Sequence, residues 1–170
     1  MYNPKINKEK LAYCGAHLAN NKLKLILAES MTAGSLGLTF SLEKQSGDYF
    51  LGSIVCYHDD MKIQSLQIDK DLLNSYGGVS AEVTRVLAKN VKDNYQADLA
   101  IAVTGFAFDC KETSVEKPVG TVFMEICFAN RSVSKKLHFA GAAEEIIAAA
   151  NAAIIDELYE ILKNNEWTEI

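Results

Sequence analysis

Hydrophobic and polar positions follow two different periods along the chain. Three short runs rich in leucine, isoleucine and valine predict buried strands: "KLKLILA", "YFLGSIVCY" and "ADLAIAVTG". The last run is nearly continuous in apolar residues, which is typical of a strand covered on both faces. Two later runs, "VGTVFMEICFA" and "SVSKKLHFA", alternate partially and are joined by "NR", so they predict an antiparallel hairpin.

Segments with the helical period separate these strands. Ser80 is a favourable N-cap because its hydroxyl accepts from free backbone N–H groups, and the helix after it is expected to end near Asn94. The other predicted helices are residues 8–20, residues 33–44, "DDMKIQSL", "DKDLLNSYG" and a long C-terminal helix, "AAEEIIAAANAAIIDELYEILKN". Strands that alternate with helices and end in a hairpin and a helix predict an α/β sandwich with a mixed sheet.

Composition and charge narrow the domain organisation and the partners. With 170 residues, 49% of them hydrophobic, the chain is expected to be a single domain, residues 1–170, with a sizeable core. A net charge of -5 without a visible basic patch argues against a nucleic acid partner. The N-terminal segment carries charges where a signal peptide needs an apolar core, and no run is long enough to span a bilayer. We therefore expect a soluble cytoplasmic protein without membrane contact.

The cysteine and histidine positions predict neither a metal site nor a redox site. Cys14, Cys56, Cys110 and Cys127 form no CxxC pair, and the histidines show no HExxH spacing. Cys56 and Cys127 lie in apolar strands, whereas Cys110 lies in a polar loop, where a reactive thiol is an alternative. We expect no metal and no cofactor.

Polar groups stand at the ends of the three predicted buried strands. In α/β sheets, ligands bind beyond the carboxyl ends of the strands. The candidate ends are Glu29 to Thr32, Tyr57 to Asp60, and Thr104 with Gly105. If the three strands are neighbours, one cleft holds the side chains of Ser30, Tyr57, Lys62 and Thr104.

Five ordered blocks resemble a known family. "AESMTAG", "GSIVCYHDDMK", "YGGVSAEV", "ADLAIAVTG" and "EKPVGTVF" are similar to the CinA C-terminal domain family, which includes stand-alone nicotinamide-nucleotide amidases. The resemblance covers roughly the whole chain. It implies a three-layer α/β/α sandwich with a mixed sheet, and hydrolysis of the carboxamide of nicotinamide mononucleotide to nicotinate mononucleotide and ammonia. It also implies a role in pyridine nucleotide salvage and NAD metabolism.

The resemblance also implies roles for individual residues. Ser30 matches the family's proposed nucleophile and Lys62 its base, while Tyr57 and Thr104 match further active-site positions. A serine hydroxyl is a poor nucleophile and needs a base within hydrogen-bond reach, and a lysine can serve when its amine is neutral. Ser30 precedes a predicted helix N-terminus, where free amides can stabilise an oxyanion. The chemistry implied is an acyl-enzyme mechanism that needs no metal.

The same blocks suggest contacts to the substrate. We assign Glu29, Thr32, Gly34 and Gly105 to substrate binding. Lys117, in "EKPVGTV", ends a loop over residues 106–117 and is a candidate for a cation that contacts the substrate.

Each candidate has an alternative that involves no chemistry. From the residues alone, a serine before a helix is more often a cap than a nucleophile, and the family blocks reverse this preference for Ser30. The alternatives are a helix cap for Ser30 or Thr32, a solvated surface charge for Lys62, a strand-end aromatic for Tyr57, a turn residue for Thr104, and a carboxylate that holds backbone amides for Glu29.

The chain also departs from the family pattern near the expected phosphate site. Family members commonly follow the Val-Thr-Gly strand end with Ile-Ala-Gly-Pro, whereas here Phe108 and Asp109 stand at the Gly and Pro positions. We expect Phe108 to fill part of the pocket and Asp109 to repel a phosphate. Ala33 replaces the first of two usual glycines, and "GAAEEIIAAAN" lacks the arginines that would be natural phosphate ligands.

Two hypotheses for function remain. The first is an active amidase on a pyridine nucleotide or a relative, including an amide that lacks the 5'-phosphate. The second is a catalytically inactive CinA-like domain that acts as a ligand-binding or protein-binding module. Because family members often self-associate, we expect a homodimer in either case.

Overall fold

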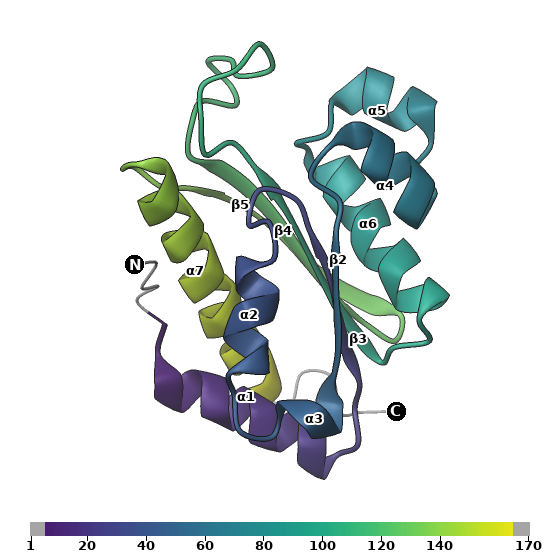
Figure 1. The fold of residues 1–170 in the computed structure, drawn as a ribbon, viewed down its shortest axis with the longest axis vertical. Coiled ribbons are helices and arrows are strands. Elements are labelled where there is room, and N and C mark those ends of the chain that lie inside the picture. The colour runs from purple at the N-terminus through teal and green to yellow at the C-terminus, as the bar shows by residue number, and fades with distance from the viewer. Residues whose placement is uncertain (1–5, 165–170) are drawn as a thin grey trace.

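A five-stranded mixed sheet in the order β2-β1-β3-β4-β5 forms the centre of the protein (Figure 1). The computed structural model describes residues 6–164. The strands are β1 (Leu25–Glu29), β2 (Phe50–Val55), β3 (Leu99–Gly105), β4 (Thr121–Phe128) and β5 (Arg131–His138). Strand β1 pairs in parallel with β2 and β3, whereas the β3–β4 and β4–β5 pairs are antiparallel. The predicted mixed sheet and C-terminal hairpin are confirmed.

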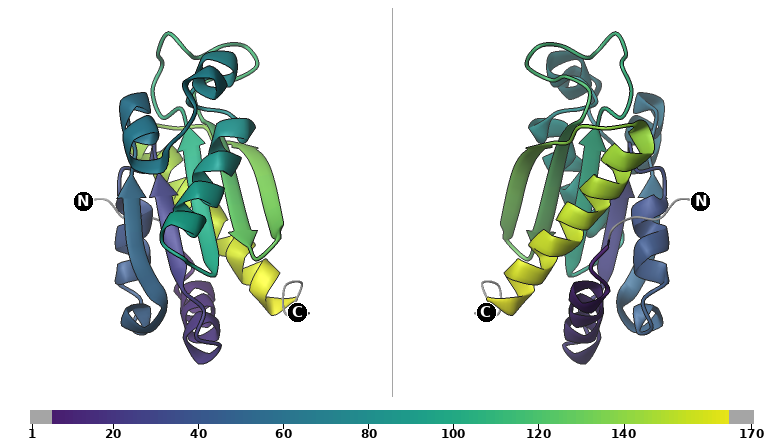
Figure 2. Two further views of the ribbon diagram at one scale, coloured as in Figure 1. Left: turned by 90° about the vertical axis from the view of Figure 1, so that its right-hand side faces the viewer. Right: turned by 90° about the vertical axis from the view of Figure 1, so that its left-hand side faces the viewer.

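Helices cover both faces of this sheet, which gives the three-layer α/β/α sandwich. Figure 2 shows α6 over one face and α7 over the other. The helices are α1 (Lys8–Asn20), α2 (Ser35–Ser41), α3 (Ser46–Tyr49), α4 (Asp59–Leu66), α5 (Lys70–Tyr76), α6 (Ala81–Asn94) and α7 (Ala143–Lys163). Apolar residues of α1, α2, α3 and α7 form one core, and those of α4, α5 and α6 form the other.

The buried strands have apolar residues on both faces because both faces are covered. In β1, Leu25 and Leu27 pack into the core with α7, while Ile26 and Ala28 pack into the core with α6. All five residues of β1 are buried. The nearly continuous apolar runs of β1 and β3 therefore follow from their central position in the sheet.

The helix predicted over residues 33–44 is shorter in the structure, and its predicted start is wrong. Ala33 and Gly34 adopt left-handed backbone conformations, with φ of 49° and 95°, which a right-handed helix does not accommodate. The turn after β1 therefore continues to Gly34 before α2 begins at Ser35. The short helix α3 was not predicted, and its last residue, Tyr49, was assigned to the start of the strand that follows.

Two further properties concern the described part of the chain. Within residues 6–164, no helix is both long and apolar enough to cross a membrane. Cys14, Cys56 and Cys127 are buried, whereas Cys110 is exposed. Because burial raises the pKa of Cys56 and Cys127 to about 11, these two thiols are protonated at neutral pH.

Candidate active site

The carboxyl ends of β1, β2 and β3 meet at one end of the sheet, because these three parallel strands are neighbours (Figure 2). Backbone hydrogen bonds continue past the end of β1: Ser30 N donates to Val103 O at 3.1 Å. On the other side of β1, Cys56 N donates to Glu29 O at 2.8 Å. The three strand ends that carry candidate residues are therefore adjacent. A shared cleft was expected only if these strands are neighbours, and they are.

Ser30 is buried and stands in the first position after β1. Its carbonyl accepts from Ala33 N at 3.1 Å, so the residue belongs to the tight turn that leads to α2. It is separated from Ser35, the first residue of α2, by this turn. No side-chain cap hydrogen bond is formed by Gly34, which occupies the N-cap position of α2. Ser30 is thus not the cap of the helix that follows it.

The Glu29 carboxylate satisfies the beginning of α2 from inside the protein. It is fully buried and accepts five hydrogen bonds, from Thr32 Oγ1 (2.7 Å), Gly34 N (2.9 Å), Leu36 N (3.1 Å), Gly37 N (2.8 Å) and Ser53 Oγ (2.7 Å). Three of these donors are backbone amides at the start of α2, so they are not free to bind an oxyanion. This geometry supports the alternative in which the Glu29 carboxylate holds backbone amides. The Thr32 hydroxyl donates to the same carboxylate, and the N-cap position of α2 belongs to Gly34.

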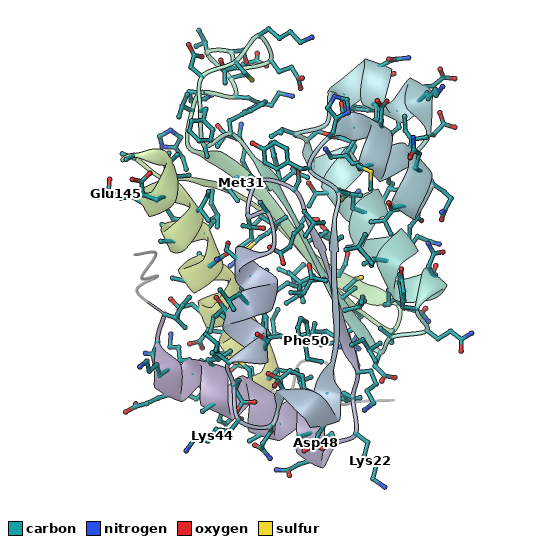
Figure 3. The ribbon with its side chains drawn as sticks, in the orientation of Figure 1. Lys22, Met31, Lys44, Asp48, Phe50 and Glu145 are labelled. Carbon is teal, nitrogen blue, oxygen red and sulfur yellow. The ribbon has the colours of Figure 1, made fainter. Side chains whose placement is uncertain are left out.

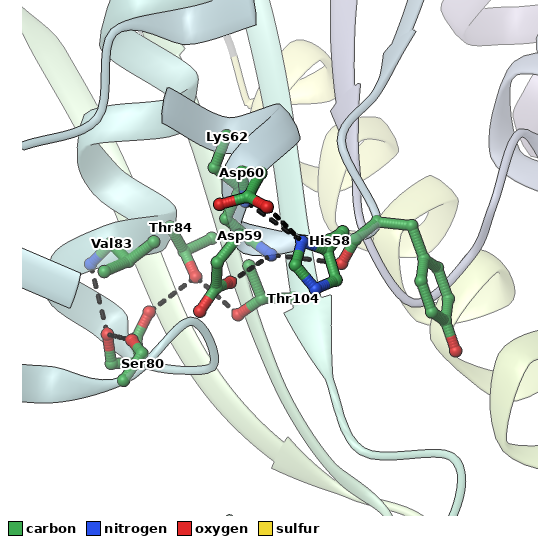
Figure 4. Close-up of polar contacts among 10 residues, drawn as sticks. His58, Asp59, Asp60, Lys62, Ser80, Val83, Thr84 and Thr104 are labelled. Atoms are coloured by element: carbon green, nitrogen blue, oxygen red, sulfur yellow. Dashed lines mark hydrogen bonds and ion pairs between the residues drawn. The ribbon is translucent and has the colours of Figure 1, made fainter. Parts of the chain in front are cut away.

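Lys62 lies on α4, and its side chain is only 2% exposed. Its Nζ donates to Asp59 Oδ1 at 2.9 Å and to the carbonyl of Tyr57 at 3.2 Å (Figure 4). Lysines are almost never buried without such partners, because removing the amine from water is unfavourable. The alternative of a solvated surface charge is therefore wrong for Lys62.

Asp59 lies within a predicted candidate strand end, Tyr57 to Asp60, but no role was assigned to it from the sequence. Its side chain is 41% exposed, in contrast to the buried lysine that it binds. A Cβ atom added at Gly78 would lie 2.2 Å from Asp59 Oδ1, so the carboxylate packs directly against the segment between α5 and α6. The signal that was available is the i,i+3 spacing of Asp59 and Lys62, which places the two on one helix face.

Thr104 is linked through the hydroxyl of Thr84 to the backbone carbonyl of Ser80 (Figure 4). Thr84 Oγ1 donates to the carbonyl of Ser80 at 2.6 Å and lies 2.8 Å from Thr104 Oγ1. Because a hydroxyl has one proton, this arrangement makes Thr104 the donor to Thr84 and leaves acceptor capacity on Thr104 Oγ1. Thr104 pairs with Phe123 within the sheet, so it is a strand residue rather than a turn residue. Neither Ser80 nor Thr84 was predicted to contact the site.

Two other candidates contribute chiefly through the backbone. The Tyr57 carbonyl binds Lys62, while the Tyr57 side chain is 57% exposed. Gly105 has no room for a side chain: a Cβ atom there would lie 2.2 Å from Met31 Sδ and 2.7 Å from the carbonyl of Thr121. Met31, which is labelled in Figure 3, follows Ser30 directly, so Gly105 permits close packing beside the candidate nucleophile.

Lys117 and the loop around it are arranged differently from the expectation. Lys117 Nζ donates to the carbonyls of Tyr76 (3.1 Å) and Val79 (3.0 Å), so the amine links this loop to the segment between α5 and α6. The Phe108 side chain is 61% exposed, and Asp109 accepts a hydrogen bond from Thr113 within the loop. Phe108 therefore lies largely in solvent, and the expectation that it fills the pocket is wrong.

No metal centre competes with this interpretation in the described part of the chain. In residues 6–164, no group of three or more His, Cys, Asp and Glu side chains is arranged to hold a metal ion.

Fold and site together define a three-layer α/β/α domain with a serine and a buried lysine at the carboxyl end of its parallel strands. The chain belongs to the CinA family: the model of the CinA C-terminal domain matches residues 7–162. A CinA-like protein from Syntrophomonas wolfei is 36% identical over 160 residues, which are 93% of this chain and 38% of that relative. A putative competence-damage inducible protein from Bacillus cereus is 34% identical over 142 residues, covering 82% of this chain and 34% of the relative. The chain thus spans little more than a third of the length of these curated relatives.

Solved structures agree with the fold. The crystal structure of competence damage-inducible protein A (ComA) from Klebsiella pneumoniae superposes with a TM-score of 0.86 at 26% identity, covering 94% of this chain and 98% of that one. A CinA superfamily protein from Escherichia coli, at 24% identity and a TM-score of 0.84, shows the same fold.

Proposed function

We propose that this protein is a serine amidase that hydrolyses the carboxamide of nicotinamide mononucleotide, or of a related pyridine nucleotide or nucleoside, to the carboxylate and ammonia. The observation that carries the proposal is the buried Lys62 amine at the same end of the sheet as Ser30. A nucleophilic serine needs a base, and a buried lysine at the same end of the sheet is a candidate for that role. Membership in the CinA family supports the choice of substrate.

In the proposed reaction, Ser30 Oγ attacks the carboxamide carbon while the neutral Lys62 amine takes the hydroxyl proton. The C–N bond then breaks, and Lys62 returns this proton to the departing nitrogen, which leaves as ammonia. The product of this half-reaction is an ester between the pyridine carbonyl and Ser30. Water then attacks the ester as Lys62 accepts one of its protons, the C–O bond to Ser30 breaks, and Lys62 returns this proton to Ser30 Oγ. The carboxylic acid releases its remaining proton to solvent and leaves as the carboxylate.

The other candidates have supporting roles in this proposal. The exposed Tyr57 side chain contacts the substrate at the rim, and Thr104 offers its free acceptor capacity at the strand end. Two of the three donor positions of Lys117 Nζ are used by backbone carbonyls, which leaves one N–H of this amine to bind a 5'-phosphate. We therefore propose that the substrate range includes the nucleoside as well as the nucleotide.

The test is ammonia release from nicotinamide mononucleotide and from nicotinamide riboside by the purified protein. The Ser30→Ala variant should release none, whereas Ser41→Ala, a control at an exposed serine at the end of α2, should match the wild type. The ratio of the rates of ammonia release from the two substrates measures how strongly the reaction depends on the 5'-phosphate. Absence of ammonia from both substrates would favour the alternative function, a catalytically inactive domain that binds a ligand or a protein.

A further inference from the structure

The Lys62 amine is bound from two directions. Its partners are the Tyr57 carbonyl at 3.2 Å and Asp59 Oδ1 at 2.9 Å. A neutral amine has two N–H groups and one lone pair in a tetrahedral arrangement. When both N–H groups donate to these acceptors, the lone pair has one remaining direction, and a protonated amine has one remaining N–H in that direction. The two fixed partners therefore determine the direction from Nζ along which Lys62 can accept or donate a proton.

Asp59 is itself held in place by the segment between α5 and α6. Its Oδ1 atom packs against Gly78, where a Cβ atom would come within 2.2 Å. This segment is tied down by Ser80 Oγ, which donates to the Gly77 carbonyl at 3.1 Å, and by Lys117 Nζ, which donates to the carbonyl of Val79 at 3.0 Å. Asp59 thus has a defined position although its side chain is partly exposed.

We propose that Asp59 is a positioning residue for the Lys62 base. It accepts one N–H of Lys62 and so directs the remaining tetrahedral position of Nζ towards the nucleophile and the leaving group. This inference rests on the proposed Ser30 and Lys62 mechanism. The role requires an oxygen acceptor at position 59, and it does not require contact between Asp59 and the substrate.

The test compares four variants. Asp59→Ala removes the acceptor and should lower kcat by about 10- to 100-fold with KM little changed, because a misdirected base affects the transition state rather than substrate binding. Asp59→Asn keeps an acceptor oxygen and should restore most of kcat. Asp60→Ala is the matched control, because Asp60 is the adjacent carboxylate and pairs with His58 instead of Lys62. Gly78→Ala should reproduce the Asp59→Ala effect by displacing the carboxylate.

A second readout is independent of the amide substrate. A fluorophosphonate reacts with an activated serine: the oxygen of Ser30 bonds to phosphorus, fluoride leaves, and the base takes the serine proton. The rate of Ser30 labelling, measured by mass spectrometry, should fall in Asp59→Ala and Gly78→Ala and recover in Asp59→Asn. Wild-type protein that labels but releases no ammonia would contradict the proposed substrate, while slower labelling in Asp59→Ala would still support the positioning role.

Three results would overturn the inference. They are wild-type kinetics and labelling in Asp59→Ala, equal losses in Asp59→Asn and Asp59→Ala, and wild-type protein that neither labels at Ser30 nor releases ammonia. The last result would overturn the proposed amidase function as well. Thermal melting of each variant shows whether a loss of activity comes from a misplaced base or from an unfolded protein. If Asp59→Ala does not fold, Gly78→Ala provides the test.

Discussion

Ser53 on β2 donates a hydrogen bond to Glu29 on β1, with 2.7 Å between Ser53 Oγ and Glu29 Oε1. This bond joins two neighbouring strands immediately before the candidate nucleophile, Ser30. The same carboxylate also binds three amides of the turn and helix that follow. Glu29 therefore connects β1, β2 and α2 at the point where the candidate site is built.

Replacement of Glu29 should destabilise the protein strongly. Glu29→Ala leaves several buried donors without an acceptor, so the free energy of unfolding should fall by about 3 kcal/mol or more. Ser53→Ala, the control, removes only one of the bonds and should cost about 1 kcal/mol. Urea denaturation followed by circular dichroism measures both changes. Equal effects of the two substitutions would contradict this role for Glu29.

Gly105 should tolerate no side chain. In Gly105→Ala, the new methyl group would meet Met31 Sδ and the backbone carbonyl of Thr121, and a backbone atom cannot move aside easily. We expect a loss of about 1–3 kcal/mol in stability and lower amidase activity, because the turn that carries Ser30 must shift. Gly47→Ala is the control, since a Cβ atom there has no neighbour within 4 Å. The melting temperature of each variant measures the change in stability. A Gly105→Ala protein with the melting temperature of the wild type would refute the prediction.

Buried thiols should make the protein less stable in alkaline solution. Burial raises the pKa of Cys56 and Cys127 from 9.0 to about 11, and that of Cys14 to about 12. The folded state keeps these protons more tightly than the unfolded state does. The resulting stabilisation is complete below pH 9.0 and is lost as the pH rises towards the folded-state pKa of each thiol, by an amount on the order of 3 kcal/mol for Cys56 and for Cys127 and somewhat more for Cys14.

The free energy of unfolding, measured by urea denaturation at several pH values from 8 upwards, tests this directly. A variant with alanine at Cys14, Cys56 and Cys127 should lose stability with a shallower slope than the wild type. The other titratable groups are common to both proteins and serve as the internal control. Parallel slopes would show that the thiols are not responsible.

The two edges of the sheet differ in a way that predicts self-association. Edge strand β5 carries Arg131, Lys135 and Lys136, which protect it from pairing with another chain. Edge strand β2 has the sequence "FLGSIV" without a charge, and it carries the exposed apolar side chains of Leu51 and Val55. Leu38 and Leu42 are exposed on α2 and at its C-cap, and α2 contacts β2. An uncharged edge with apolar neighbours favours pairing with the same edge of a second copy.

We therefore propose a homodimer that buries β2, and we expect Leu51→Lys to produce a monomer. Analytical ultracentrifugation of the wild type and the variant at matched concentrations measures the change. Val115→Lys is the control, because Val115 is a fully exposed apolar residue in the loop after β3. A wild-type protein that remains a monomer at tens of micromolar would disprove the prediction, as would a dimer that Leu51→Lys leaves intact.

Much of the architecture was predictable from the sequence because strands and helices follow local periodicity. The continuous apolar runs of β1 and β3, the partial alternation of β4 and β5, and the N-cap at Ser80 are all readable from adjacent residues. The apolar run before Glu29 also placed Ser30 at a strand end, where the structure has it. Boundaries were less predictable, since the left-handed conformations of Ala33 and Gly34 depend on the turn that Glu29 organises.

The tertiary structure alone decided which of these elements are neighbours and which polar groups are buried. The sequence could not reveal that Lys62 is shielded from water, because its burial comes from segments packed around α4. Likewise, Thr84 reaches Thr104 across 20 positions of the chain, and Lys117 reaches Val79 across 38. The sequence by itself thus determined the kinds of elements, their order and the family. The three-dimensional packing determined the environment of each candidate, because burial and hydrogen bonding depend on residues that are distant in the chain.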